Sequence, residues 1–234
     1  MKRSALLFLL TAMMAMAAPA YSQTDELLLA FTGFDYQDPN TNPSVFLAVG
    51  EGYKAVGFVT SFGPLLDPWT DVSVEEYTFH IFDLTVATRQ AFGSFVGVTC
   101  TNGGRGRYFY DDLPPPGGVG THGTYGVNPP NATAPSTFID AVMGLGGSID
   151  NFVLTYNFGT NQGNFQGNMT LDEGPYLAYI PVAQRAGWVL GGLAGRPNGT
   201  IPTGYDDQLS GECRIPGSTN TTHGTWGAVK ALYR

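Results

Sequence analysis

The chain has 234 residues, a formal net charge of −8, and only 13% charged residues against 43% hydrophobic ones. A chain with few charges and many aromatic residues is not a disordered one. No cluster of Lys and Arg is present with which a nucleic-acid binder would neutralise phosphates, so we expect no nucleic-acid partner. The length suits one domain with a sizeable core, and the 32 Gly and 16 Pro predict frequent turns.

Residues 1–22 have the three parts of a cleaved secretory signal. Lys2 and Arg3 precede an apolar run, small residues follow, and a polar segment begins after Ser22. The run is too short for a spanning helix, and no second apolar run reaches the roughly 18 residues that a membrane span requires. The sequence therefore predicts an exported protein without a membrane span that acts in the periplasm, at the cell surface or outside the cell.

The segment from residue 35 to 42 places several side-chain oxygens in one loop. Asp35, Asp38 and Asn40 carry the kind of oxygen ligand that Ca²⁺ prefers. One interpretation is a structural calcium site that stiffens the loop, and calcium is the only cofactor that the sequence suggests. An ordinary turn held by Asx hydrogen bonds explains the same residues.

Alternation of apolar and polar residues predicts strands along most of the chain. It is clearest over 150–158 and 163–171, where the intervening Gly159-Thr160-Asn161-Gln162 has turn chemistry, so these two runs are expected to form an antiparallel hairpin. Further strands are expected at 26–34, 45–49, 53–62, 74–83, 90–99, 105–110, 137–147, 187–194 and 207–214. A short helix is expected at 181–186. So many short strands predict an all-β, antiparallel β-sandwich of jelly-roll type, with a closed β-barrel as the second choice.

Cys100 and Cys213 are the two cysteines of the chain. In an exported protein such a pair favours one disulfide, which would close a long loop. Two buried free thiols are the alternative. A metal site is disfavoured because neither cysteine belongs to a CxxC motif.

The pattern divides the chain into the signal at 1–22, one β domain at 23–215, and a linker with a short tail helix at 216–234. The Pro- and Gly-rich loop from 113 to 135 is an alternative boundary between two domains. The ending Thr225-Trp226-Gly227…Lys230…Tyr233-Arg234 resembles tails on uncharacterised exported bacterial proteins. That resemblance covers ten residues and implies no activity. The tail either docks on its own domain or is recognised by a sorting or assembly partner.

Catalytic signatures such as GxSxG and HExxH are absent from the sequence. The remaining candidates for catalytic residues are the carboxylate doublets at 75–76, 111–112, 172–173 and 206–207. Because adjacent strand residues point to opposite faces, no doublet is itself a catalytic pair. Trp69, Tyr108 and Tyr110 are candidates for stacking on sugar rings, although aromatic residues usually serve the core.

Three functions are consistent with these observations, and one of them is a structural subunit that self-associates through its terminal strand or tail. The first is an exported, non-catalytic β module with a binding or structural role at the cell surface or outside the cell, whose partner is a glycan or another surface component. The second is a secreted carbohydrate-active hydrolase that combines carboxylates from different doublets. The missing catalytic motifs favour the first.

Overall fold

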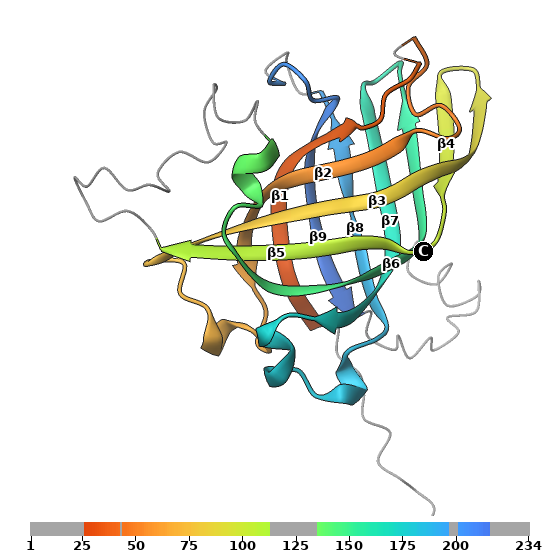
Figure 1. Cartoon of the computed structure of the whole chain (residues 1–234). Helices are drawn as coiled ribbons and strands as arrows, with labels where there is room; N and C mark the ends of the chain where they lie inside the picture. Colours follow the sequence, from red (N-terminus) through yellow and green to blue (C-terminus); the bar gives the residue numbers. More distant parts are fainter. Residues whose placement is uncertain (1–25, 43, 113–134, 197–200, 216–234) are drawn as a thin grey trace, which may run out of the picture. The chain divides into compact units, whose positions relative to one another are not determined.

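Nine antiparallel strands make up most of the chain in the computed structural model, which describes residues 26–42, 44–112, 135–196 and 201–215 (Figure 1). Most strands pair with their neighbours in the sequence, as in a meander, and the exception is β4 and β5, which do not pair with each other. The strands are β1 (Glu26–Gln37), β2 (Gly52–Phe62), β3 (Glu75–Phe92), β4 (Phe95–Cys100), β5 (Gly104–Asp112), β6 (Val142–Asn157), β7 (Gln162–Glu173), β8 (Trp188–Gly195) and β9 (Asp207–Ile215). Among the described residues, the 3₁₀ helices between them are η1 (Asp67–Trp69), η3 (Pro135–Phe138), η4 (Pro175–Tyr179) and η5 (Val182–Gln184).

The sheet closes into a barrel because β1 pairs with both β2 and β9. Strands β4 and β5 occupy one position in the wall, since each pairs with β3 on one side and β6 on the other, and the wall therefore has eight positions. The closed barrel is the second of the two architectures expected from the sequence, and the sandwich is not confirmed. Within the described residues, no helix is long and apolar enough to cross a bilayer.

The wall bends sharply where β4 gives way to β5. Asn102 Oδ1 accepts a hydrogen bond from the backbone N–H of Asn151 at 2.9 Å, and Asp150 Oδ1 accepts one from the N–H of Gly103 at 3.0 Å. Asn151 of β6 and Asp83 of β3, the strands on either side of β4 and β5, both have positive φ angles, which Asn and Asp tolerate better than most residues. These short polar side chains replace the missing ladder bonds at the bend.

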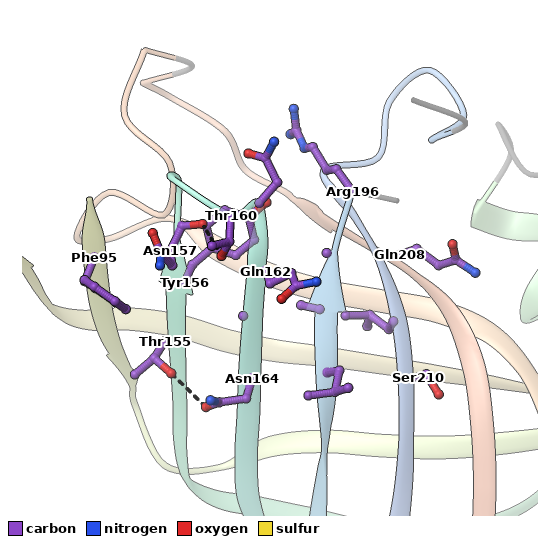
Figure 2. Close-up of a pocket in the computed structure, with 16 residues that line it drawn as sticks. Phe95, Thr155, Tyr156, Asn157, Thr160, Gln162, Asn164, Arg196, Gln208 and Ser210 are labelled. Atoms are coloured by element: carbon purple, nitrogen blue, oxygen red, sulfur yellow. Dashed lines mark hydrogen bonds between the residues drawn. The ribbon is translucent and has the colours of Figure 1, made fainter. Parts of the chain in front are cut away.

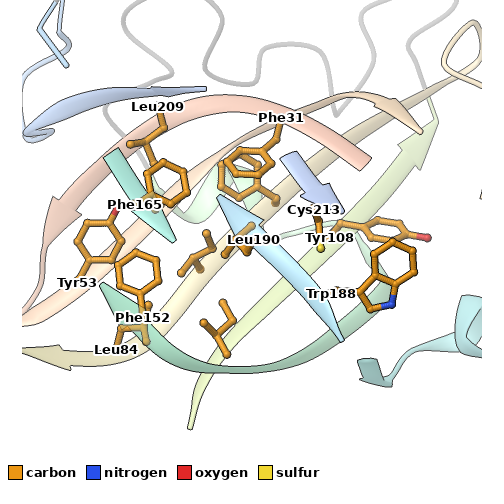
Figure 3. Close-up of a cluster of buried hydrophobic side chains, with 14 of the residues drawn as sticks. Phe31, Tyr53, Leu84, Tyr108, Phe152, Phe165, Trp188, Leu190, Leu209 and Cys213 are labelled. Carbon is orange, nitrogen blue, oxygen red and sulfur yellow. The ribbon is translucent and has the colours of Figure 1, made fainter. Parts of the chain in front are cut away.

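Alternate residues of every strand fill the barrel with apolar side chains (Figure 3). Phe31 of β1 lies at the centre, with its ring centroid 4.8 Å from that of Phe79 and 6.2 Å from that of Phe165. Close by, an apolar cavity of about 40 Å³ remains, lined by residues that include Leu190 and Cys213. That space admits a few water molecules at most, so side chains rather than a ligand fill this part of the interior.

Glycines let the aromatic rings lie flat against the wall. Gly33 faces Gly57 across β1 and β2, and Gly192 faces Gly211 across β8 and β9. A Cβ at Gly211 would lie 2.7 Å from Cζ of the Phe31 ring. The absence of side chains at these positions thus provides the room that the central rings occupy.

A smaller apolar cluster covers the outside of β1 and β2. Phe138 of η3 is fully buried there and packs edge-on against Phe58, while Thr78 donates a hydrogen bond to the Phe138 carbonyl at 2.7 Å. Tyr205 packs against Phe34 from the segment that precedes β9. This part of the wall is therefore buried on both faces.

Most predicted strands are present, and the hairpin of 150–158 with 163–171 is confirmed as β6 and β7. Residues 45–49 form turns instead of a strand, because Glu51 and Gln37 hold the backbone N–H groups of Ala48 and Leu47. The strand expected at 74–83 continues to Phe92, and the one expected at 90–99 is divided by a turn at residues 93–94 between β3 and β4. The runs at 137–147 and 150–158 join into β6 only from Val142 onward, because residues 137–138 belong to η3. The helical turn expected at 181–186 is η5. The signal segment, the loop from 113 to 134 and the tail from 216 lie outside the described residues.

The predicted disulfide is not formed, because Cys100 and Cys213 are free thiols on opposite sides of the barrel. Cys100 belongs to β4 and Cys213 to β9, and three wall positions separate them in either direction. A disulfide requires Cα atoms within about 7 Å, and neighbouring strands are already about 4.8 Å apart. Cys213 instead lies 4.0 Å from the Met169 sulfur.

We expect neither thiol to react with a disulfide reagent at about pH 8 in the folded protein, whereas both react after denaturation. Burial raises the pKa of each thiol to about 12, which leaves almost no nucleophilic thiolate. Thiol counting before and after denaturation measures this, and added reductant should leave the melting temperature unchanged. A non-reduced peptide map that joins the two cysteine peptides would contradict it.

Candidate functional site

The outer face of the barrel carries a groove of about 880 Å³ over β4 and β6 to β9 (Figure 2). Its floor consists of two neighbouring cross-strand rows that the strand registers bring together. The first row is Phe95, Asn157, Gln162, Gly195 and Gln208. The second row is Thr155, Asn164, Leu193 and Ser210.

Neutral hydrogen-bonding groups dominate this groove. Of the 16 residues that line it, five carry amides and three carry aliphatic hydroxyls, while none is acidic. Phe95 and Leu193 add two apolar side chains, each more than half exposed. A surface without carboxylates is notable on a chain with 19 acidic residues.

The groove's polar side chains are partly oriented by one another. Thr155 Oγ1 donates a hydrogen bond to Asn164 Oδ1 at 2.7 Å, drawn as a dashed line in Figure 2. Because that bond engages the amide oxygen, Asn164 presents its Nδ2 group as a donor. The row therefore offers donors as well as acceptors to a ligand.

Arg196 lies at one end of the groove, just after β8. Its Nε donates to the backbone carbonyl of Asp206 at 2.6 Å and lies 3.5 Å from Oδ1 of Asp207. Its backbone N–H donates to the carbonyl of Asn161 at 3.1 Å, which ties the end of β8 to the β6–β7 turn. Neighbouring carboxylates thus compensate the guanidinium charge.

Asp207 belongs to a buried acidic pair with Asp35. Asp35 Oδ1 accepts a hydrogen bond from the backbone N–H of Asp207 at 2.8 Å, and the Tyr156 hydroxyl donates to Asp207 Oδ1 at 2.9 Å. Both aspartates are at most 1% exposed. Tyr156 also lines the groove, so the pair lies directly beneath its Arg196 end.

Burial raises the pKa of Asp35 well above its ordinary value, and the negative charges of Asp207 and Asp206 raise it further. Burial raises the pKa of Asp207 as well, but the Tyr156 hydroxyl and Arg196 oppose that rise. The two carboxyl groups therefore differ in environment, since only Asp207 has a cation beside it.

The residues of the expected calcium loop are not brought together. Asp35 is buried in the wall, Asp38 forms an exposed ion pair with Lys54, and Asn40 is exposed. The buried Glu51 carboxylate instead organises the loop, accepting hydrogen bonds from the N–H groups of Asn42 at 2.6 Å and Ala48 at 3.2 Å. Among the residues that the structure describes, no three His, Cys, Asp or Glu side chains are arranged to hold a metal ion.

The expected binding residues Trp69, Tyr108 and Tyr110 lie at the opposite end of the barrel, linked by two tyrosines of η4. Trp69 stacks on Tyr179 with ring centroids 4.0 Å apart and an interplanar angle of 8°. Tyr176, next to Tyr179, contacts both Tyr108 and Tyr110. Tyr108 is buried, so this aromatic end of the barrel mainly closes the core, and only the Trp69–Tyr179 stack is half exposed.

The carboxylate doublets have separate structural partners. Asp172 and Glu173 bind Arg105 and Arg107 in bidentate pairs, with N–O distances of 2.7–3.1 Å. Glu76 faces Asp111 across β3 and β5, and burial together with Asp111 and Asp140 raises the pKa of Glu76 to about 7. None of these acids lines the groove.

The fold and the groove define an eight-position antiparallel barrel with a filled interior and an external, neutral polar site. No protein-family model, no curated protein and no solved structure matches the chain in comparisons with known proteins. Sequence analysis missed the groove, although the polar faces of the 150–158 and 163–171 runs, which include Thr155 and Asn164, were the available signal. The rest of the groove depends on strand register.

Proposed function

We propose that this chain is an exported, non-catalytic binding module, and that its outer groove binds a polyhydroxylated ligand of the glycan class. The observation that supports this most is the double row of amide and hydroxyl side chains without a carboxylate. A sugar hydroxyl both donates and accepts hydrogen bonds, as amides and hydroxyls do. Phe95 and Leu193 offer apolar contact to the C–H face of a ring.

The groove is open, which suits a ligand that is a segment of a longer chain. It runs across five strands and lies on rigid sheet, so its side chains are positioned before the ligand arrives. Preorganisation lowers the entropic cost of binding. A scaffold of this kind is what a surface or extracellular recognition role needs.

The proposal predicts that Asn164→Ala and Gln208→Ala each weaken binding of a neutral oligosaccharide about tenfold, the loss of roughly one hydrogen bond. An oligosaccharide array identifies the probe, and calorimetry measures its affinity. Asn168→Ala and Gln166→Ala are matched controls, because both side chains are exposed on β7 but do not line the groove. The controls should remain within about twofold of the unaltered protein.

Two other results would contradict the groove as the site. If no oligosaccharide binds, the glycan class is wrong. If Trp69→Ala abolishes binding while the groove variants retain it, the ligand stacks at the aromatic end instead.

A hydrolase remains the second candidate because of Glu76, whose pKa of about 7 is suitable for a general acid. The same incubations report on it: released reducing ends that disappear in Glu76→Gln would favour the hydrolase. Binding without product favours the module.

A further inference from the structure

Polar atoms in and beside the buried acidic pair lack hydrogen-bond partners. Asp35 Oδ2, Asp207 Oδ2 and the Tyr53 hydroxyl are buried and have no hydrogen-bond partner among the described residues. Tyr53 is itself only 2% exposed. Leaving a buried polar atom unpaired costs about 1–3 kcal/mol, and more when the atom carries charge. The Tyr53 hydroxyl is itself a donor and lies near Asp35, so the two carboxylate oxygens are the atoms that a fully ionised description of the pair leaves poorly accounted for.

A single proton resolves most of this deficit. An ionised carboxylate only accepts hydrogen bonds, whereas a protonated one also donates. A proton on Asp35 gives the buried pair a donor of its own, in addition to the Tyr53 hydroxyl. It also removes one of two negative charges that share a site from which water is excluded.

The surroundings decide which carboxyl group keeps that proton. Asp207 accepts a hydrogen bond from Tyr156 and has Arg196 beside it. Asp35 accepts one backbone hydrogen bond and has the Tyr53 hydroxyl nearby, which lowers the pKa of Asp35 less than burial and the charge of Asp207 raise it, and Asp35 has no cation among its described neighbours. The ionised form is therefore better stabilised at Asp207. The titratable and charged groups that face the pair are Tyr53 of β2, Tyr156 of β6, Arg196 after β8, and Asp206 just before β9, with Cys100 of β4 next to Tyr53.

We propose that Asp35 and Asp207 share one proton in the folded protein, and that its release as the pH rises adds a second negative charge beneath the Arg196 end of the groove. This inference rests on the proposed function, because it describes how pH regulates the same groove. The link is physical, because Asp207 contacts Arg196 and Tyr156, both of which line the groove.

The sign of the pH effect follows from the direction of the shift. Asp35 titrates at about pH 3.9 in the unfolded chain and at a higher pH in the folded one. Below about pH 4 both states are protonated and the group has no effect on stability. As the pH rises above that value the unfolded chain loses the proton first, so stability falls until the folded protein releases its own.

Asp35→Asn tests this without any ligand, so a failure here is distinguishable from a failure of glycan binding. The amide keeps an oxygen for the Asp207 N–H and supplies a permanent donor, so the variant should melt at least about 3 °C above the unaltered protein at about pH 8. Towards pH 4 that difference should fall below about 1 °C. Asp83→Asn, an exposed aspartate on β3, is the matched control and should follow the unaltered protein throughout.

Carboxyl ¹³C NMR of the unaltered protein provides a readout that a purely structural role would not move. One of the two buried carboxyl groups should remain protonated well above pH 4, and Arg196→Gln should move the titration of the pair to higher pH because it removes the cation. Both carboxyls titrating together near pH 4 would overturn the proposal. So would a melting difference for Asp35→Asn that does not depend on pH, or a titration that Arg196→Gln leaves unchanged.

Discussion

Replacing Gly211 by valine is expected to unfold the barrel, or to lower its free energy of unfolding by at least about 3 kcal/mol. Gly211 faces the interior from β9. A Cβ there would lie 2.7 Å from Cζ of Phe31 and 2.6 Å from the carbonyl oxygen of Gly191, closer than real Cβ contacts allow. The Phe79 and Phe165 rings pack near Phe31 and restrict its movement, and the Gly191 carbonyl belongs to the backbone of β8, which cannot shift as a side chain can.

Denaturant unfolding followed by circular dichroism measures the effect. Gly97→Ala is the matched control, since Gly97 lies in β4 with no atom within 4 Å of the position of its Cβ. That variant should be unchanged or more stable by up to about 1 kcal/mol, because alanine restricts the unfolded chain. An unaltered unfolding midpoint for Gly211→Val would show that the central rings do not depend on the glycine.

Trp188→Ala is expected to lower the free energy of unfolding by about 3–5 kcal/mol. Trp188 is fully buried at the start of β8, and its Nε1 donates a hydrogen bond to the carbonyl of Gln184 at 2.7 Å. Alanine leaves a large cavity and an unpaired carbonyl, so both costs apply. Trp188→Phe keeps most of the apolar volume and should cost clearly less.

Trp69→Ala is the comparison for the loss of stability expected from Trp188→Ala. Trp69 is about half exposed, and its main contact is the stack on Tyr179, so its removal should cost about 1 kcal/mol. The same denaturant series measures all three tryptophan variants. Equal losses at Trp69 and Trp188 would contradict the distinction between the closed core and the exposed stack.

Local chemistry made the strands predictable, and closure was harder to predict. The β6–β7 hairpin follows from alternation and from the Gly159–Gln162 turn, which depend on neighbouring residues alone. A sandwich and a barrel share the same inward and outward alternation, so the pattern of Phe152, Leu154 and Tyr156 fits both. What distinguishes them is the pairing of β1 with β9, a contact between the two ends of the domain.

The candidate site shows the same division between local and distant information. Thr155 and Asn164 could be assigned to an exposed polar face from the sequence. Their neighbours Leu193 and Ser210 join them through the registers of β8 and β9, which are set by the whole wall. Asp35 was interpreted as a loop ligand because its oxygen-rich neighbours lie close in sequence, whereas its partner Asp207 is 172 residues away.

The pairing of β1 with β9 also imposes an order on how the barrel forms. Strands β1 to β8 can pair one after another as the chain grows, but they remain an open ribbon with two unpaired edges. The ribbon closes only when the last strand is available, and that contact carries the largest loop-closure cost. Asp35 and Asp207 lie on either side of this seam, so the acidic pair and the groove above it are assembled in the final step. A chain that ends before β9 has neither the closed wall nor the site.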